Sequence, residues 1–227
     1  EGYGQVVPFR GAFKNVGLKA RTPVQVSGVT ADEQKVLPDI EAALDKLKIC
    51  NGMTVSFHHH LRNGDFVLNK VMECIAKRGI KDLTVAASSI FPIHAPLVGH
   101  MEQGVVTGLV TSYLSGPVAE AVSQGKLKKP VVMQTHGGRA RAIESGDLHI
   151  DIAFLAAPAA DRGGNCNGVQ GEAACGSLGY AAADAEYADK TVVIIDHLVP
   201  YPACPIEISQ IFVDYVVQID SIGDPKG

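Results

Sequence analysis

Residues 51–65 read Asn-Gly-Met-Thr-Val-Ser-Phe-His-His-His-Leu-Arg-Asn-Gly-Asp, and this stretch decides the fold class. The apolar run from Met53 to Phe57 predicts a short buried strand, and the polar residues after it predict a turn into a helix. In α/β proteins, ligands bind where a parallel strand ends and the next helix begins, because side chains and amides there can meet an anion together. The stretch therefore predicts a parallel sheet with an anion-binding site at its edge.

The rest of the chain repeats this alternation of strand and helix. Further strands are expected at 83–87, 105–110, 131–134, 150–156, 191–195 and 212–219, and helices at 38–47, 66–77, 95–102, 117–123, 139–144 and 181–188. Near-continuously apolar strands separated by helices are typical of a parallel sheet covered on both faces. We predict an α/β domain over residues 31–227, a mostly parallel sheet with helices on both faces. Residues 1–30, with frequent glycine and proline, are expected to form an irregular N-terminal arm.

The composition narrows the class of protein. The chain has 227 residues, 46% of them hydrophobic, and a net charge of -4, so it can bury a core and has no basic surplus for nucleic acid. No apolar run reaches the roughly 18 residues that a membrane span requires, and no signal peptide is evident. The five cysteines form no Cys-x-x-Cys pair, which favours a reduced, cytoplasmic protein. Glu1 is not an initiator methionine and the chain stops soon after the last expected strand, so we expect a fragment that ends at a domain boundary.

Polar or glycine-rich residues follow four of the expected strands, and parallel strands end at one edge of the sheet. Arg62 adds a fixed cation that can hold a carboxylate with two hydrogen bonds. The pair Gly137-Gly138 leaves backbone amides open to a ligand, although a plain tight turn explains it equally well. The candidate binding residues at these strand ends are His58, His59, His60, Arg62, Asn63, Gly64, Ser88, Ser112, His136, Gly137, Gly138 and Arg139.

The histidine triplet also invites a metal interpretation, which we do not favour. Adjacent residues on an extended backbone alternate sides, so at most His58 and His60 point the same way. No Cys-x-x-Cys or His-Glu-x-x-His motif supplies further ligands, and we predict no metal. Histidines that only satisfy polar needs at a strand end remain an alternative. A serine nucleophile, a P-loop and a dinucleotide fingerprint are absent from the sequence, and the turn-rich residues 160–168 are either a structural bend or a wall of the site.

Several motifs together resemble one enzyme family, the citrate lyase alpha subunit or citrate CoA-transferase, in its amino-terminal half. The motifs are residues 51–65, His94-Ala-Pro-Leu-Val98, Gly116-Pro-Val-Ala-Glu120, Thr135-His-Gly-Gly-Arg139, Gly171-Glu-Ala-Ala-Cys-Gly-Ser-Leu-Gly-Tyr180 and Pro200-Tyr-Pro202. The resemblance extends from about residue 2 to residue 227. It implies the CoA-transferase fold, which is related to that of sugar-phosphate isomerases.

The resemblance also implies a reaction and its partners. Citrate replaces the acetyl group on a thioester, giving a citryl thioester and acetate. The thiol belongs to a phosphoribosyl-dephospho-CoA group on an acyl carrier (gamma) subunit, and a citryl lyase (beta) subunit then cleaves the product. The implied protein binds no cofactor tightly, needs no metal for the transfer, and works as part of an oligomeric complex in the cytoplasm, away from membranes and nucleic acid.

The transfer chemistry assigns expected roles to the candidate residues. Holding a trianion requires cations, which Arg62 and the three histidines supply, and the developing oxyanion requires donors, for which the amides of Gly64, Gly137 and Gly138 are candidates. The family carries a second, similar domain beyond this one, and in the broader family any carboxylate nucleophile lies there. The Gly-Gly-Phe turn of other CoA-transferases has no counterpart at residues 58–65. We therefore expect half of an active site and an inactive isolated fragment.

Two other functions are compatible with the sequence. A ligand-sensing or subunit-docking module could use the same fold without turnover, and no citrate binding by calorimetry would favour docking. Sugar-phosphate isomerase chemistry predicts a phosphate-binding loop and catalytic carboxylates, which we do not find.

Overall fold

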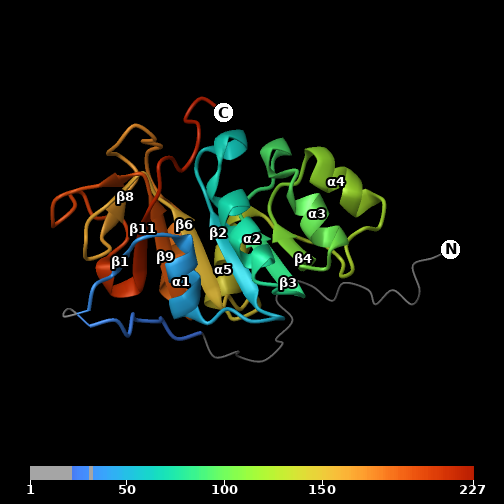
Figure 1. The fold of residues 1–227 in the computed structure, drawn as a ribbon, viewed down its shortest axis with the longest axis horizontal. Helices are drawn as coiled ribbons and strands as arrows, with labels where there is room; N and C mark the ends of the chain where they lie inside the picture. Colours follow the sequence, from blue (N-terminus) through green and yellow to red (C-terminus); the bar gives the residue numbers. More distant parts are fainter. Residues whose placement is uncertain (1–21, 31–32) are drawn as a thin grey trace, which may run out of the picture.

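The computed structural model describes residues 22–30 and 33–227, and its centre is an eight-stranded sheet in the order β1-β11-β9-β6-β2-β3-β4-β5 (Figure 1). Every pair of neighbouring strands in this sheet is parallel. The strands are β1 (Val36–Leu37), β2 (Thr54–His58), β3 (Leu83–Ala87), β4 (Val106–Thr111), β5 (Val132–Met133), β6 (Ile152–Ala156), β9 (Lys190–Ile195) and β11 (Tyr215–Gln218). The predicted parallel α/β class is confirmed.

Helices cover both faces of the sheet, as predicted. They are α1 (Ile40–Leu47), α2 (Val67–Lys77), α3 (Leu97–Glu102), α4 (Gly116–Ser123), α5 (His136–Glu144) and α6 (Ala181–Tyr187). The first four share one hydrophobic cluster with Val55 and Phe57, and the last two share another with Ala153 and Leu155. Because strand side chains alternate between faces, strands such as β6 and β9 contribute to both clusters. The result is three layers, with α1 to α4 in front of the sheet and α5 behind it in Figure 1.

Helix α1 illustrates how the sequence determines these elements. The Asp39 carboxylate accepts a hydrogen bond of 2.8 Å from the Ala42 amide, so it caps the first turn. The buried positions Ile40, Ala43, Leu44 and Leu47 follow helical spacing and face the core. Lys48 ends the helix in the left-handed conformation, with φ of 53°.

The order in which successive strands join the sheet explains where a ligand site is expected. From β2, the chain adds β3, β4 and β5 on one side, and then β6, β9 and β11 on the other. The direction of winding therefore reverses between β2 and β6. In open parallel sheets, the carboxyl ends of the strands on either side of such a reversal leave a crevice in which ligands bind. Strand β2 ends at His58, the first residue of the histidine triplet.

The structure differs from the sequence prediction in a few elements. Helix α5 begins at His136 instead of residue 139, and the last strand is shorter than predicted because residues 210–212 form a 3-10 helix, η3 (Gln210–Phe212). Strand β1 and a small three-stranded sheet of β10, β7 and β8 were not predicted. These small strands are β7 (Ala159–Ala160), β8 (Cys166–Asn167) and β10 (His197–Leu198). Two-residue strands are too short to show an alternating pattern.

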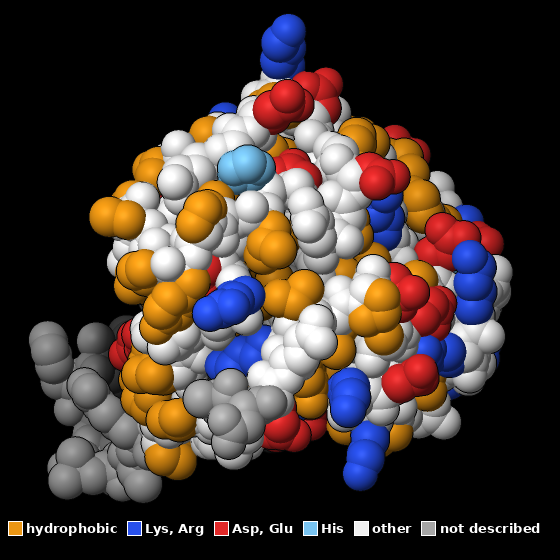
Figure 2. All heavy atoms as spheres, turned by 60° about the vertical axis from the view of Figure 1, so that its left-hand side comes forward, with side chains coloured by type: hydrophobic (Ala, Val, Ile, Leu, Met, Phe, Trp, Pro, Cys, Tyr) orange, Lys and Arg blue, Asp and Glu red, His pale blue; other side chains and the backbone are white. Residues whose placement is uncertain are grey.

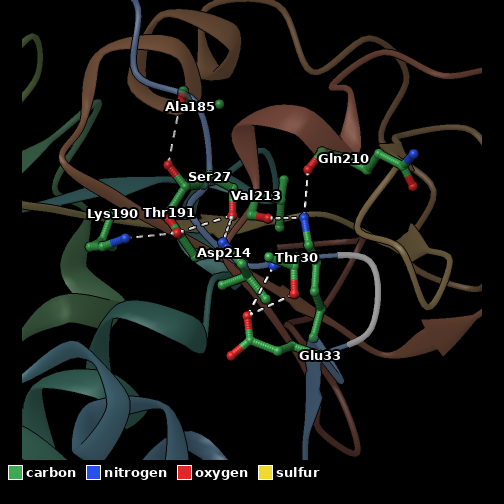
Figure 3. Close-up of polar contacts among 11 residues, drawn as sticks. Ser27, Thr30, Glu33, Ala185, Lys190, Thr191, Gln210, Val213 and Asp214 are labelled. Carbon is green, nitrogen blue, oxygen red and sulfur yellow. Dashed lines mark hydrogen bonds and ion pairs between the residues drawn. The ribbon is translucent and has the colours of Figure 1, made fainter.

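Of the predicted N-terminal arm, residues 1–21 lie outside the described part of the chain, and residues 22–30 form neither helix nor strand. Ser27 donates a hydrogen bond of 3.1 Å to the Asp214 carboxylate, which also accepts from Lys190 and the Thr191 amide (Figure 3). The Ser27 amide donates to the Ile211 carbonyl. These bonds attach this segment to the β9 and β11 side of the sheet. In the described part of the chain, no helix is long and apolar enough to cross a membrane.

Candidate functional site

A cavity of about 570 Å³ opens at the carboxyl ends of β2, β3 and β4, where the fold predicts a ligand site. Its lining combines histidine, arginine and serine with aromatic side chains. The lining residues are His58, His59, His60, Arg62, Ser88, Ser89, Phe91, Tyr113, His136, Ser177, Leu178, Gly179 and Tyr180. Six of the sequence-predicted residues therefore meet in one cavity: His58, His59, His60, Arg62, Ser88 and His136.

The three consecutive histidines point in alternating directions. The rings of His58 and His60 lie 5.0 Å apart, centroid to centroid. The ring of His59 turns the other way, where its Nε2 lies 3.0 Å from the Ser89 carbonyl oxygen and its edge packs against His94. The alternation expected of an extended backbone is confirmed: the His58 and His60 rings pair with each other and the His59 ring does not join them, although all three residues line the cavity.

Burial keeps these histidines uncharged. The pKa of His58 is well below its ordinary value, first because of burial and then because His60 and Arg139 lie nearby. Burial and, to a smaller extent, His59 lower the pKa of His60 to about 4. The side-chain nitrogens of His58 have no hydrogen-bond partner among the described residues. At neutral pH each imidazole offers a ligand one N–H donor and one acceptor, so in this structure the triplet does not supply the cations that the sequence suggested.

Arg62 is the permanent cation at the cavity. It begins a 3-10 turn, η1 (Arg62–Gly64), with φ of 51°, a left-handed conformation that is uncommon for a residue other than glycine. Its side chain is exposed and forms no ion pair with any other described residue. A cation held in a strained turn beside two neutral imidazoles is suited to bind a carboxylate through several hydrogen bonds.

A buried network fixes the loop that carries Arg62. The Asp65 carboxylate accepts hydrogen bonds from His94, 3.1 Å away, and from the first amides of α2. Burial raises the pKa of Asp65, but nearby His59 and His94 and the Leu68 amide outweigh burial, and the net shift is downward. Potential ligand atoms of His59, Asp65 and His94 lie within 4.8 Å of one another. Both ring nitrogens of His94 already have hydrogen-bond partners, so we interpret the cluster as structural support.

One wall of the cavity was missed by the sequence prediction. It consists of residues 177–180, which come from the loop between β8 and α6, and Tyr180 packs near His136 with ring centroids 6.1 Å apart. Phe91 and Tyr113 also line the cavity, with ring centroids 5.1 Å apart and ring planes tilted by 39°. The only signal for this wall was the family-like motif over residues 171–180, because loop residues show no periodicity. Residues 160–168 do not line this cavity, so they are not a wall of it.

Five other predicted residues lie outside the cavity lining. The Asn63 side chain accepts from the Ile93 amide, 3.0 Å away, and Ser112 is not among the lining residues. Gly64 is buried, and its carbonyl accepts from Asp224. Gly137 and Gly138 belong to the first turn of α5, where the Gly138 amide donates to the Thr135 hydroxyl. The structure therefore does not support the prediction that these three amides donate to the oxyanion. The Gly64 and Gly138 amides already have hydrogen-bond partners, and Gly137 does not line the cavity.

Arg139 is the largest correction. It was predicted to bind substrate, but its side chain is 2% exposed and lies between the sheet and α6. There it pairs with Asp184 and donates hydrogen bonds of 2.9 Å to the Ser56 hydroxyl and 3.1 Å to the Ala86 carbonyl. The helix begins three residues earlier than predicted, and this turns Arg139 inward. Its charge is close enough to lower the pKa of His58, but it does not line the cavity.

A second cavity, of about 840 Å³, lies on the side of the molecule that carries β1 and β8. Its walls include Val26, Lys35, Arg162 and Tyr201. Figure 2 brings this side forward and shows exposed hydrophobic side chains mixed with Lys and Arg. None of the sequence-predicted site residues lines it, and it is not at the carboxyl ends of β2 to β4. The cavity beside the histidine triplet is therefore the candidate site.

Comparison with known proteins identifies the family. Residues 33–227 match the model of the family "Citrate lyase, alpha subunit (CitF)". The chain belongs to the citrate lyase alpha subunit family. Citrate lyase alpha chains from Haemophilus influenzae and Klebsiella pneumoniae are 49% identical over 197 residues and 42% identical over 222 residues. These alignments cover 87% and 98% of this chain but 39% and 44% of the relatives. The chain thus spans about two-fifths of their length.

Solved structures agree with this family assignment. The alpha subunit of citrate lyase from Streptococcus mutans, solved in complex with citrate, superposes with a TM-score of 0.90 at 49% identity. The match covers 94% of this chain and 42% of that one. Glutaconate coenzyme A-transferase from Acidaminococcus fermentans superposes with a TM-score of 0.60 at 14% identity, covering 81% and 75% of the two chains. At that identity the likeness shows the fold alone, and it confirms the predicted CoA-transferase type.

Proposed function

We propose that this citrate lyase family chain forms the citrate-binding half of a citrate CoA-transferase. The observation that supports this most is the cavity itself, where Arg62, which forms no ion pair with another described residue, and the neutral His58 and His60 line one space at the end of β2. Citrate presents carboxylates and a hydroxyl, which match a fixed guanidinium and imidazole N–H groups. The Streptococcus mutans relative was solved with citrate, which supports the same ligand here.

The proposed reaction exchanges one acyl group for another on a thioester. A citrate carboxylate attacks the acetyl thioester of an acyl carrier, the carrier thiolate leaves, and a mixed acetyl-citryl anhydride forms. The thiolate then attacks the citryl carbonyl, which releases acetate and leaves citrate on the carrier. Arg62 holds a spectator carboxylate, and an imidazole N–H of His58 or His60 stabilises the oxyanion. The aromatic side chains of Phe91, Tyr113 and Tyr180 help exclude water, which would hydrolyse the anhydride.

We propose the partners that this reaction requires. The thioester is a substrate carried by an acyl carrier (gamma) subunit on its phosphoribosyl-dephospho-CoA group. A citryl lyase (beta) subunit consumes the citryl thioester, so the chain works in an oligomeric complex, in the cytoplasm. Adding citrate and acetylated carrier is expected to release acetate only when the carboxyl-terminal domain of a family relative is also supplied. Acetate release without that domain would contradict the half-site proposal, and failure to bind citrate would favour a docking role.

Replacing Arg62 by alanine tests the citrate site directly. We expect the citrate dissociation constant, measured by calorimetry, to rise at least about tenfold, because a charge-assisted hydrogen bond contributes roughly 1.5–3 kcal/mol. Arg62→Lys should recover part of the affinity, since it keeps the charge but not the two-pronged geometry. Arg141→Ala is a matched control, because Arg141 is exposed on α5 and does not line the cavity. Equal affinities for the Arg62→Ala variant and the unmodified chain would exclude Arg62 from the site.

A further inference from the structure

The wall of the cavity formed by residues 177–180 has no helix or strand of its own. These four residues are the last part of the loop 168–180, which connects β8 to α6. The loop is closed at its base, where the Gly168 carbonyl accepts from the Cys175 and Gly176 amides at 2.9 and 3.0 Å. A side chain on Gly168 would place its Cβ 1.7 Å from the Gly176 carbonyl oxygen, so only glycine fits this contact. The base of the loop is thus fixed, but these bonds do not reach the wall.

One carboxylate connects the base of the loop to the wall. Glu207 accepts a hydrogen bond of 2.6 Å from the amide of Leu178, the second residue of the wall. Its other oxygen lies 3.4 Å from the Gly168 amide. Leu178 is 2% exposed and belongs to the hydrophobic cluster that includes residues of α5 and α6, so its amide is at the point where the wall meets the core. A charged acceptor makes a stronger hydrogen bond than a neutral one, particularly away from water.

Glu207 is itself held in place by the small sheet. The amides of Glu207 and Ile208 both donate to the Cys166 carbonyl, and the Cys166 amide donates back to Ile208. Cys166 belongs to β8 and is fully buried. The carboxylate therefore projects from a rigid backbone and not from a free loop. Glu207 does not line the cavity.

From this arrangement we infer that Glu207 is a positioning residue for the candidate site: its carboxylate fixes the wall 177–180 in place and thereby helps to set the shape of the cavity. It acts through the Leu178 amide and not by touching the ligand. The inference rests on the proposed citrate site for its effect on binding. The effect on the wall itself does not depend on the identity of the ligand.

Two variants test this inference. In Glu207→Ala, we expect amide hydrogen exchange in peptides that cover residues 176–180 to accelerate at least about tenfold, and the citrate dissociation constant to rise at least about fivefold, because the bond to the charged acceptor is lost. Glu207→Gln keeps one acceptor oxygen, so its exchange rate and its citrate dissociation constant should lie between those of the unmodified chain and of Glu207→Ala. Glu172→Ala is the control, since Glu172 is an exposed carboxylate on the same loop.

The outcomes separate a positioning role from a structural one. A lower melting temperature with unchanged exchange at 176–180 and unchanged citrate affinity would overturn the inference, as would a Glu207→Ala variant indistinguishable from the Glu172→Ala control. If the alanine variant does not fold, the same measurements on Glu207→Gln decide. If the unmodified chain binds no citrate, the proposed function fails, while faster exchange at 176–180 in the variant still supports the role of Glu207.

Discussion

Replacing Asp184 by alanine is expected to lower the free energy of unfolding by about 3–5 kcal/mol, because it leaves the guanidinium of Arg139 buried without its counter-charge. Both side chains are essentially inaccessible, at 2% and 0% exposure. Asp184 also accepts a hydrogen bond from Ser56 on β2, so the variant removes support from the strand that ends at the histidine triplet. Urea denaturation followed by circular dichroism measures the effect.

The exposed ion pair of Lys126 and Glu102 provides the matched control. Its atoms are 2.8 Å apart, but the side chains are 40% and 53% exposed. Glu102→Ala should therefore change the free energy of unfolding by about 1 kcal/mol or less. Replacing Arg139 and Asp184 together by Met and Leu should cost less than Asp184→Ala alone, since no unpaired charge remains. A loss below about 1 kcal/mol for Asp184→Ala would show that the buried pair does not matter for stability.

Lowering the pH from 7 to 5 is expected to destabilise the ligand-free chain by about 2 kcal/mol through His60 alone. The pKa of His60 is about 4 in the folded chain against an ordinary value of 6.5, so the unfolded chain binds the proton more tightly. The stabilisation from this group is therefore complete above pH 6.5 and is lost as the pH falls toward 4. The pKa values of His58 and His59 are also lowered, first by burial, and they act in the same direction.

Urea denaturation at a series of pH values, for the unmodified chain and for His60→Gln, measures this dependence. The variant should be less sensitive to pH between 7 and 5, because glutamine takes up no proton there. His149→Gln is the control, since His149 is exposed, beside Asp151 and Asp189, at the opposite end of β6. A His60→Gln variant with the same pH dependence as the unmodified chain would mean that His60 is not buried in its neutral form.

Local sequence patterns predicted most of the helices and strands. Strand β3 was predicted at its observed bounds, and β2 and α2 were predicted within one residue, since apolar runs and capping residues act over a few residues. The histidine pair at the cavity followed from the two-residue repeat of a strand. The small sheet of β10, β7 and β8 did not, because its strands depend on contacts between distant segments.

The site was predicted only in part, because some of its features depend on contacts between segments that are distant in the sequence. His58, Arg62 and His136 were expected at one edge of the sheet, and the structure brings them into one cavity. Arg139 was misassigned because the sequence shows an arginine after a pair of glycines but does not show whether its side chain faces the cavity or the core. The wall at residues 177–180 was missed because its position depends on Glu207, which is 29 residues from Leu178 along the chain.

The sequence by itself determined the parallel α/β class, the strand that presents the histidines and the family. These depend on periodicity and on motifs, which are local properties of the chain. Only the tertiary structure decided which polar groups face the cavity and which are buried beneath it. Burial makes the histidines neutral and gives Arg139 a carboxylate partner, and both effects come from neighbours distant in sequence. Arg62 lines the cavity as the sequence predicted, and it carries a permanent charge. The neutral imidazoles lie beside it.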